Sequence, residues 1–272
     1  MPLPTHRAIH SQCVLAAAAS VVAVCGCASI PPPPSAPPTA DAALMRMHAT
    51  LACGNGIQAN AKFDLFGEHG RGRGELLLFA VRPARIRLDI VSPFGVALAT
   101  LTAVPVPGHV LVDLLRGEAP VLRHTPQAAT ITWSAQGYWV LFIPSTSDAR
   151  EEIHIAPRPD DWTKPWEQQR MRVLDVRVEQ QQYVLYHAEL TEHAATATAG
   201  PREDPDGLAP ALPPSGPPCD AEIPRKIRME VPDPEADVRF QYQDRKWNPP
   251  LPEGTFEQPA PPGMPVEPVN CE

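Results

Sequence analysis

The segment that decides the fold runs from Arg85 to Ile90 and has the sequence Arg-Ile-Arg-Leu-Asp-Ile. Its apolar side chains, Ile86, Leu88 and Ile90, alternate with charged ones. Successive side chains of a β-strand point to opposite faces of the sheet, so this alternation predicts a half-buried strand.

Many short segments of similar character precede and follow this strand. They occupy residues 59–66, 75–81, 96–102, 130–133, 138–142, 152–155, 171–179, 183–190, 227–231 and 238–242. Short turns join most of them, and few segments have helical periodicity. The pattern predicts a mainly β (α+β) protein built on a meandering antiparallel sheet.

Two segments have the marks of helices. Residues 42–53 repeat apolar side chains every three or four positions, with Asp41 available to cap the start and Gly54 to end the helix. Residues 110–115 follow a Pro-Gly pair and stop at Gly117, which suits a carboxyl-terminal cap. A further short strand is the alternative interpretation of this second segment.

The amino terminus is typical of an exported protein. A weakly positive start is followed by an apolar run over residues 13–24, whereas a membrane-spanning helix needs roughly 20 residues. The run therefore predicts a signal peptide over residues 1–26. The sequence Val24-Cys25-Gly26-Cys27 resembles the lipobox of bacterial lipoproteins, which predicts cleavage before Cys27 and lipid on its thiol. The alternatives are an uncleaved helix or a Cys-x-Cys metal pair.

Composition bounds the remaining organisation. The 272 residues carry a net charge of −8, which argues against a nucleic-acid or anionic-membrane partner. The 36 prolines exceed what one compact domain needs. We expect a Pro-rich tether at 27–40, one domain at 41–258 with a disordered insertion at 194–221, and a Pro-rich tail at 259–272.

The six cysteines reduce to three once the amino terminus is processed. Removal of the signal and acylation of Cys27 leave Cys53, Cys219 and Cys271. An oxidising periplasm permits one disulfide among them. We expect Cys53 to pair with Cys271, because Cys219 lies in the segment expected to be flexible.

No grouping of residues indicates catalysis, a cofactor or a metal. Serine-hydrolase, phosphate-loop and paired Cys-x-x-Cys motifs are absent from the sequence. Residues 151–154 place carboxylates beside His154, but on a strand Ile153 would take the buried face. We expect Trp162 and Trp166 to cover a sheet edge, and residues 70–74, an Arg-Gly repeat, to form a hairpin turn. The sequence therefore predicts a protein that is not an enzyme.

The order of three segments resembles the LolB-like family, outer-membrane lipoprotein receptors that share a fold with the periplasmic carrier LolA. They are the strand, Pro-Phe-Gly turn and strand over residues 85–96, the Pro-x-Pro entry to a short helix over 104–117, and the two terminal strands with Trp247-Asn248 over 223–248. A strand pair and helix that the family has between residues 103 and 104 are missing here.

The resemblance implies a half-barrel, an incomplete antiparallel barrel covered on one side by the two helices, with an apolar cavity for acyl chains. It implies no cofactor and gives Phe94 the role of a protruding, membrane-inserting residue. The expected partners are acyl chains or other lipoproteins, a LolA-like carrier, and the membrane through Cys27. In well-studied pathways, an Asp directly after the lipidated cysteine keeps a lipoprotein at the inner membrane. Ala28 stands at this position here, so we expect an outer-membrane location facing the periplasm. The alternative is a structural or assembly accessory of the envelope with a filled cavity.

Overall fold

The structure is a computed structural model of the chain. It describes residues 29–67, 70–91, 97–101, 107–125, 127–207, 210–232 and 235–257, with only the backbone described for 97–101.

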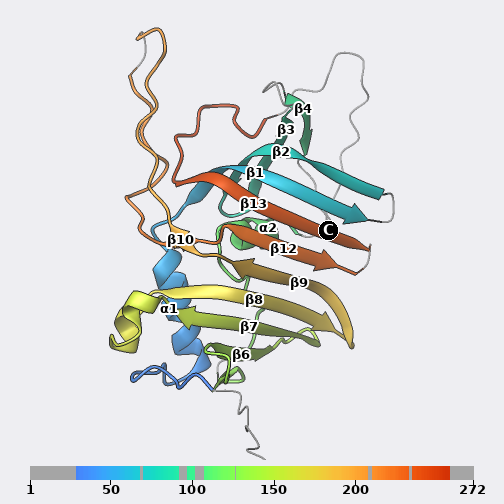
Figure 1. Cartoon of the computed structure of the whole chain (residues 1–272), viewed down its shortest axis with the longest axis vertical. Helices are drawn as coiled ribbons and strands as arrows, with labels where there is room; N and C mark the ends of the chain where they lie inside the picture. Colours follow the sequence, from blue (N-terminus) through green and yellow to red (C-terminus); the bar gives the residue numbers. More distant parts are fainter. Residues whose placement is uncertain are drawn as a thin grey trace, which may run out of the picture.

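One large antiparallel sheet dominates the molecule (Figure 1). Its eleven strands lie in the order β4-β3-β2-β1-β13-β12-β9-β8-β7-β6-β5, and no pairing among the described residues joins β4 to β5, so the sheet is open. The strands are β1 (Gly56–Gly67), β2 (Gly70–Val81), β3 (Arg85–Val91), β4 (Ala97–Leu101), β5 (Thr130–Trp133), β6 (Trp139–Pro144), β7 (Ala149–Pro157), β8 (Met171–Gln180), β9 (Tyr183–Thr191), β12 (Lys226–Val231) and β13 (Ala236–Trp247).

The chain order explains this topology. Each strand from β1 to β4, and from β5 to β9, pairs with its neighbour in sequence, so two meanders form. The late strands β12 and β13 lie between the meanders and join them, because β13 pairs with β1 and β12 pairs with β9. Every strand predicted from alternation is confirmed, and the sheet is the predicted incomplete barrel.

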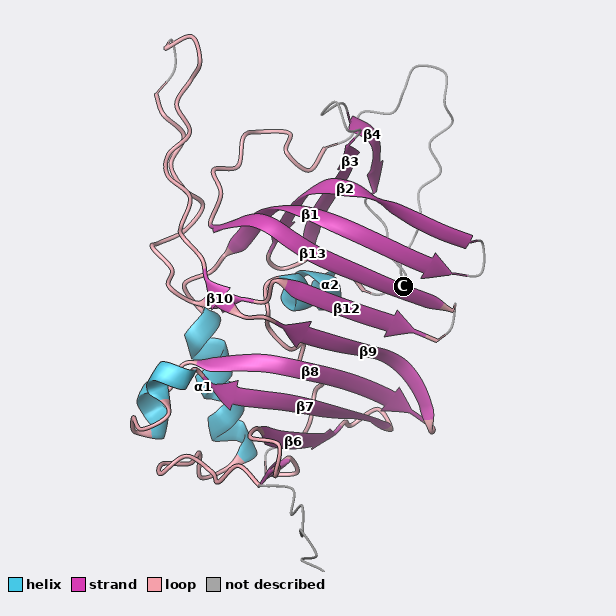
Figure 2. Ribbon diagram, viewed as in Figure 1, coloured by secondary structure: helices cyan, strands magenta, loops and turns pink. Residues whose placement is uncertain are grey.

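Both predicted helices are present, and they lie on the same side of the sheet (Figure 2). Helix α1 (Ala40–Leu51) starts earlier than expected, because Thr39 rather than Asp41 is the cap: its hydroxyl accepts a hydrogen bond from the Ala42 amide at 3.1 Å. Helix α2 (Gly108–Leu115) ends before Gly117, whose φ of 81° suits the left-handed position after a helix.

The helices bury the apolar face of the sheet, which we call the covered face. Tyr242 of β13 donates a hydrogen bond from its hydroxyl to the Leu115 carbonyl of α2 at 2.9 Å. On the other half of the sheet, the Thr50 hydroxyl of α1 accepts one from the Met171 amide of β8 at 3.1 Å. The opposite, solvated side is called the outer face.

The insertion at 194–221 is not the disordered loop that its composition predicted. Its first residues form β10 (Ala194–Ala195), which pairs with β11 (Glu222–Ile223), and Thr198 bridges to Trp247 at the end of β13. The chain between them extends away from the sheet as a long arm (Figure 1). The ends are ordered because they pack on buried side chains, an effect that local composition does not reveal.

The predicted disulfide between Cys53 and Cys271 is wrong in this structure. Cys53 is bonded to Cys219, with Cα atoms 5.1 Å apart and 166 residues between them in sequence. Cys219 is buried, and its amide donates a hydrogen bond to the Thr198 hydroxyl at 2.7 Å. Cys271 lies outside the described residues. The expectation failed because Cys219 stands at the anchored end of the insertion.

This disulfide closes a long loop, so its removal should be costly. We expect the double substitution Cys53→Ser and Cys219→Ser to lower the free energy of unfolding by about 2–4 kcal/mol, because the unfolded chain regains the freedom that the cross-link removes. Urea denaturation under oxidising conditions measures the change. Cys271→Ser is the control and should leave the curve unchanged; a loss of stability in Cys271→Ser that equals the loss in the double variant would restore the pairing that the sequence suggested.

Candidate lipid-binding face

The apolar covered face is not covered evenly along its strands. On β1 the inward side chains run from Ile57 and Ala61, which are fully buried, through half-buried Phe63 to Leu65, which is 39% exposed. The paired residues of β13 follow the same trend, since Tyr242 and Phe240 are buried and Val238 is only partly so. The helices therefore cover one end of this face, and its apolar side chains become accessible toward the other end.

This gradient follows the strand register across the centre of the sheet. Ala61, Phe63 and Leu65 stand opposite Tyr242, Phe240 and Val238, after a bulge at Asn60. Side chains directly opposite each other in an antiparallel pair lie on one face and contact each other. The accessible end of the covered face therefore consists of the carboxyl-terminal half of β1 and the amino-terminal half of β13. We call Phe63, Leu65, Val238 and Ala236 the apolar lip.

At the opposite, closed end a buried cationic side chain holds the elements together. Arg116, just after α2, is fully buried and donates hydrogen bonds to the Gly54 carbonyl and to a Glu118 carboxylate oxygen, the latter at 2.9 Å. Arg82 also contacts Glu118, and His48 of α1 lies 2.7 Å from the other Glu118 oxygen. A buried charge is tolerated only when paired and hydrogen-bonded, and here each is.

The same cluster shifts the protonation of its acids in opposite directions. Burial and the neighbouring Glu118 carboxylate raise the pKa of Asp113 to about 6. The pKa of Glu118 is lowered: burial opposes this, but the His48 hydrogen bond and the Arg116 and Arg82 charges outweigh it. Burial lowers the pKa of Arg116. Glu118 is therefore the charged partner that compensates the buried guanidinium.

A second buried acid, Glu151 of β7, has fewer partners. One oxygen accepts a hydrogen bond from the Leu122 amide at 2.8 Å, and the other has no hydrogen-bond partner. Burial raises the pKa of Glu151 to about 8 against the opposing effect of that amide. Glu151 therefore stands largely neutral at pH 7 on the covered face, among apolar neighbours such as Ile143 and Val178, with which it pairs.

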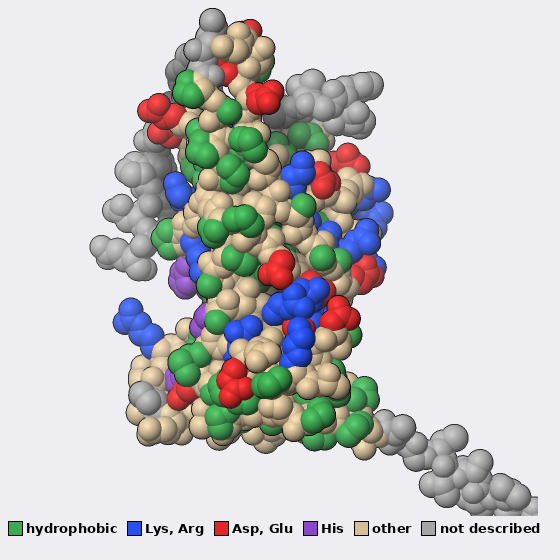
Figure 3. All heavy atoms as spheres, turned by 90° about the vertical axis from the view of Figure 1, so that its left-hand side faces the viewer, with side chains coloured by type: hydrophobic (Ala, Val, Ile, Leu, Met, Phe, Trp, Pro, Cys, Tyr) green, Lys and Arg blue, Asp and Glu red, His purple; other side chains and the backbone are tan. Residues whose placement is uncertain are grey.

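The outer face and the flank are polar in character. A groove of about 730 Å³ on the outer face is lined mainly by side chains of both signs, including Lys62, Asp64, Arg73, Arg228 and Arg239. On the flank that Figure 3 shows, basic and acidic side chains lie next to one another rather than in separate patches. Phe63, Ile227 and Phe240 also line the groove.

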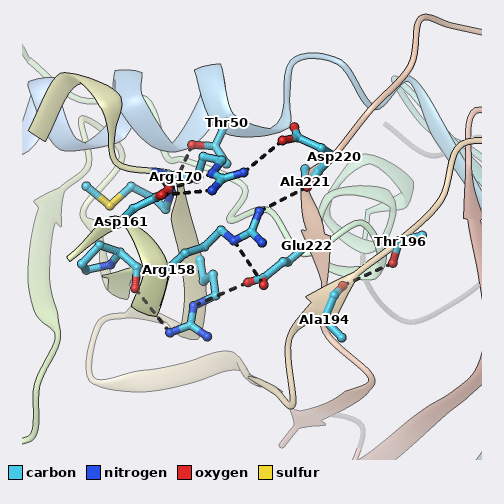
Figure 4. A network of polar contacts seen from close by, with 12 residues as sticks. Thr50, Arg158, Asp161, Arg170, Ala194, Thr196, Asp220, Ala221 and Glu222 are labelled. Carbon is cyan, nitrogen blue, oxygen red and sulfur yellow. Dashed lines mark hydrogen bonds and ion pairs between the residues drawn. The ribbon is translucent and has the colours of Figure 1, made fainter. Parts of the chain in front are cut away.

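One ion-pair network on the molecule fixes the end of the insertion to the sheet (Figure 4). Arg170, immediately before β8, contacts Asp161 at 2.7 Å and Asp220 at 3.0 Å, and the Arg158 side chain lies 3.2 Å from Glu222 of β11. The pKa of Asp161 is lowered, chiefly by its hydrogen bond with Arg170. The network holds the carboxyl-terminal end of the insertion, at Asp220 and Glu222, against the residues before β8.

Two of the residues singled out from the sequence, Cys27 and Phe94, lie outside the described residues, as does Cys271. Lipid attachment at Cys27 and protrusion of Phe94 therefore stay predictions. Of the described candidates, Cys53 lies at the closed end in its disulfide with Cys219. The residues of the apolar lip were not singled out from the sequence.

Three minor expectations can be compared with the structure. Ile153 takes the buried face, as predicted, while Glu152 and His154 lie on the outer face. Trp162 packs edge-on against Trp133 of the edge strand β5, with ring centroids 5.7 Å apart, as a cover for that edge. The Arg-Gly repeat is not a turn but the start of β2.

The sequence analysis did not identify Arg116 or Glu151 as buried ionisable residues. Glu151 could have been found, because it stands two positions before Ile153 and therefore on the same buried face. Arg116 had no such signal: its burial depends on Gly54 and Glu118, which come to it only in the folded chain.

No protein-family model matches the sequence, and a search of curated proteins finds no match. Among solved structures, the chain is similar to an outer membrane lipoprotein-sorting protein domain from Vibrio parahaemolyticus, at 9% identity and a TM-score of 0.39, over 79% of this chain and 95% of that one. A LolA superfamily protein from Nitrosomonas europaea is similar at 12% identity and a TM-score of 0.44, over 81% and 98%. A DUF1329 family protein from Desulfovibrio piger is similar at 9% identity and a TM-score of 0.41, over 79% and 94%.

The fold is defined by this chain's own geometry: an open antiparallel sheet with two helices on one face. That is the architecture which the resemblance to the LolA/LolB class implied. Among the described residues, none of the helices is both long and apolar enough to cross a membrane.

The buried Glu151 makes a prediction about pH. Its pKa in the folded chain, about 8, lies above the ordinary value of 4.5, so the unfolded chain releases the proton first as pH rises. Stability is therefore lost progressively between pH 4.5 and 8. Glu151→Gln keeps an acceptor for Leu122 and should remove this loss, making the variant more stable than wild type at pH 8 by up to about 4 kcal/mol, with little difference at pH 4.5.

Chemical denaturation at a series of pH values measures this difference. Glu75→Gln, at an exposed carboxyl of β2, is the control and should leave the pH dependence of stability unchanged. Identical pH dependence in wild type and Glu151→Gln would show that Glu151 is not a buried neutral acid.

Proposed function

We propose that the protein is a lipid-anchored lipoprotein of the bacterial envelope that binds acyl chains, those of other lipoproteins included, on the covered face of its half-barrel. The observation that carries the proposal is the gradient of burial along β1 and β13, which leaves an apolar lip next to a closed, helix-covered interior. The lipobox-like sequence before Cys27 supports a membrane tether.

Apolar burial would supply the binding free energy. Each methylene group moved from water to an apolar surface contributes about 0.8 kcal/mol. The lip offers such a surface through Phe63, Leu65 and Val238, with no charged side chain on their face of these two strand segments. The chain needs no reaction to act in this way, and the tether would set the direction of transfer by holding the site near the receiving membrane.

The expected setting is the periplasmic side of the outer membrane, with a LolA-like carrier as the donor of cargo. The likeness to solved structures supports this through the fold only. Phe94 belongs to the same proposal as the residue that would meet the membrane, since it stands in the sequence Pro93-Phe94-Gly95 that follows β3.

A second function, a non-catalytic structural or assembly accessory, is favoured by the packing at the closed end. Trp247, Tyr242 and Met47 are fully buried there and fill space between the sheet and the helices. Cargo binding would then be confined to the lip or absent.

A pair of exposed leucines separates the two functions. Leu65→Glu places a charge on the lip, whereas Leu185→Glu places one on the outer face at a residue of similar exposure, 43% against 39%. We expect Leu65→Glu to reduce acyl-chain binding at least tenfold, since burying an unpaired charge is costly. Leu185→Glu should bind as wild type does.

Mass spectrometry of the full-length protein extracted in mild detergent measures both the tether and the cargo. Under denaturing conditions only lipid covalently bound to Cys27 remains, and under native conditions an acyl chain held without a bond adds further mass. Covalent lipid without any further mass favours the accessory role. Equal uptake by the two leucine variants would contradict binding at the lip.

A further inference from the structure

The outer face carries a compact group of metal-ligating side chains that the proposed function does not use. Asp175 of β8 stands directly opposite Glu189 of β9, and His187 lies two residues before Glu189 on the same face. One ligand atom from each of the three lies within 4.8 Å of the others. Strands β7, β8 and β9 are adjacent in the sheet, so rigid pairing holds these residues together (Figure 1).

The two histidines of this region are oriented in the same way. His187 has its Nδ1 3.3 Å from Glu230, and its Nε2 faces Asp175 at 2.7 Å. His154 of β7 has its Nε2 2.6 Å from Glu152, and its Nδ1 faces the other oxygen of Asp175 at 3.9 Å. Each ring thus has one nitrogen held by an outer carboxylate and the other turned toward Asp175. Histidines that bind metals are commonly oriented by such a carboxylate on the far nitrogen.

Glu189 completes the group from the other side. Within the described part of the chain, its carboxylate makes no hydrogen bond or ion pair, although it is only half exposed and lies beside His187 and Asp175. Neighbouring acids are already engaged: Glu230 contacts Arg228, and Glu179 contacts Arg150 and Arg177. Glu189 is therefore available as a ligand.

From this geometry we propose that Asp175, His187 and Glu189 bind one divalent transition-metal ion of the zinc class, with His154 as a fourth ligand. Imidazole nitrogen and carboxylate oxygen are ligands that Zn²⁺ accepts in a tetrahedral site. Bonds of about 2 Å put tetrahedral ligand atoms roughly 3.3 Å apart, so small side-chain rotations would close Asp175, His187 and Glu189, whose ligand atoms lie within 4.8 Å of one another, on an ion. Four carboxylates, those of Glu152, Asp175, Glu189 and Glu230, surround the two histidines. Two arginines stand opposite the group, Arg177 across from His187 and Arg228 across from Glu189. Arg177 is paired with Glu179, and Arg228 is paired with Glu230 and Asp237.

The site links three strands of one meander on the face opposite the lip, so it is independent of acyl binding. Its ligands lie on β7, β8 and β9, which explains why no ligand spacing appears in the sequence. A bound ion would cross-link these strands and stabilise that half of the sheet.

Isothermal titration of the metal-free, full-length protein with Zn²⁺ tests the proposal. We expect one ion to bind per chain, and His187→Gln or Asp175→Asn to abolish that binding. Glu230→Gln, which removes the carboxylate that orients His187 but no proposed ligand, should weaken binding roughly 10- to 100-fold. His109→Gln, at an exposed histidine on α2, is the matched control and should bind as wild type does.

Cobalt substitution distinguishes the proposed site from metal binding at cysteine thiolates. Co²⁺ at the proposed site has only nitrogen and oxygen ligands, so its spectrum should lack the charge-transfer band of a thiolate complex. The proposal is overturned if Zn²⁺ does not bind, if the His187 and Asp175 variants bind it unchanged, or if the Co²⁺ spectrum shows thiolate ligands. Thermal unfolding of each variant without metal establishes that the substitutions leave the fold intact.

Discussion

The structure depends on one constraint: an open sheet with one apolar face must have that face covered. Alternation of side chains along the strands places Leu78, Ile153, Tyr242 and their neighbours on the same side, and burial of such a face is the main favourable contribution to folding. The helices α1 and α2 provide the cover, but only over one end of β1 and β13. The apolar lip is the part of the same face that the helices do not reach.

The closed end is held by contacts that join segments far apart in sequence. The disulfide joins Cys53, just after α1, to Cys219 near the carboxyl-terminal end of the insertion. Arg116 joins α2 to the carbonyl of Gly54, and the Trp247 indole donates a hydrogen bond to the Ala221 carbonyl at 2.8 Å. These contacts fix the helices against the sheet. They therefore determine how much of the covered face the helices bury and where the apolar lip begins. Loss of this connection would uncover the whole apolar face.

Much of the fold could be predicted from the sequence, because strand alternation and helical spacing are local signals. Residues 85–90 are the clearest case, and both helices were found within a few residues of their ends. The errors concern interactions between distant segments. Cys219 was assigned to a flexible stretch because its neighbours are prolines and acids, yet Thr198 and the network around Arg170 hold that stretch in place. The cluster around Asp175 was missed for the same reason, since its members come from separate strands.

The central claim is that acyl chains lie on the covered face at the lip. Photolabelling tests it most directly: the full-length protein is irradiated with a fatty acid that carries a diazirine at its methyl end, and the labelled residues are identified by tandem mass spectrometry. The account predicts label on Phe63, Leu65 and Val238. Label on the outer face, at exposed Leu185 and Phe142, or no saturable label at all, would contradict it.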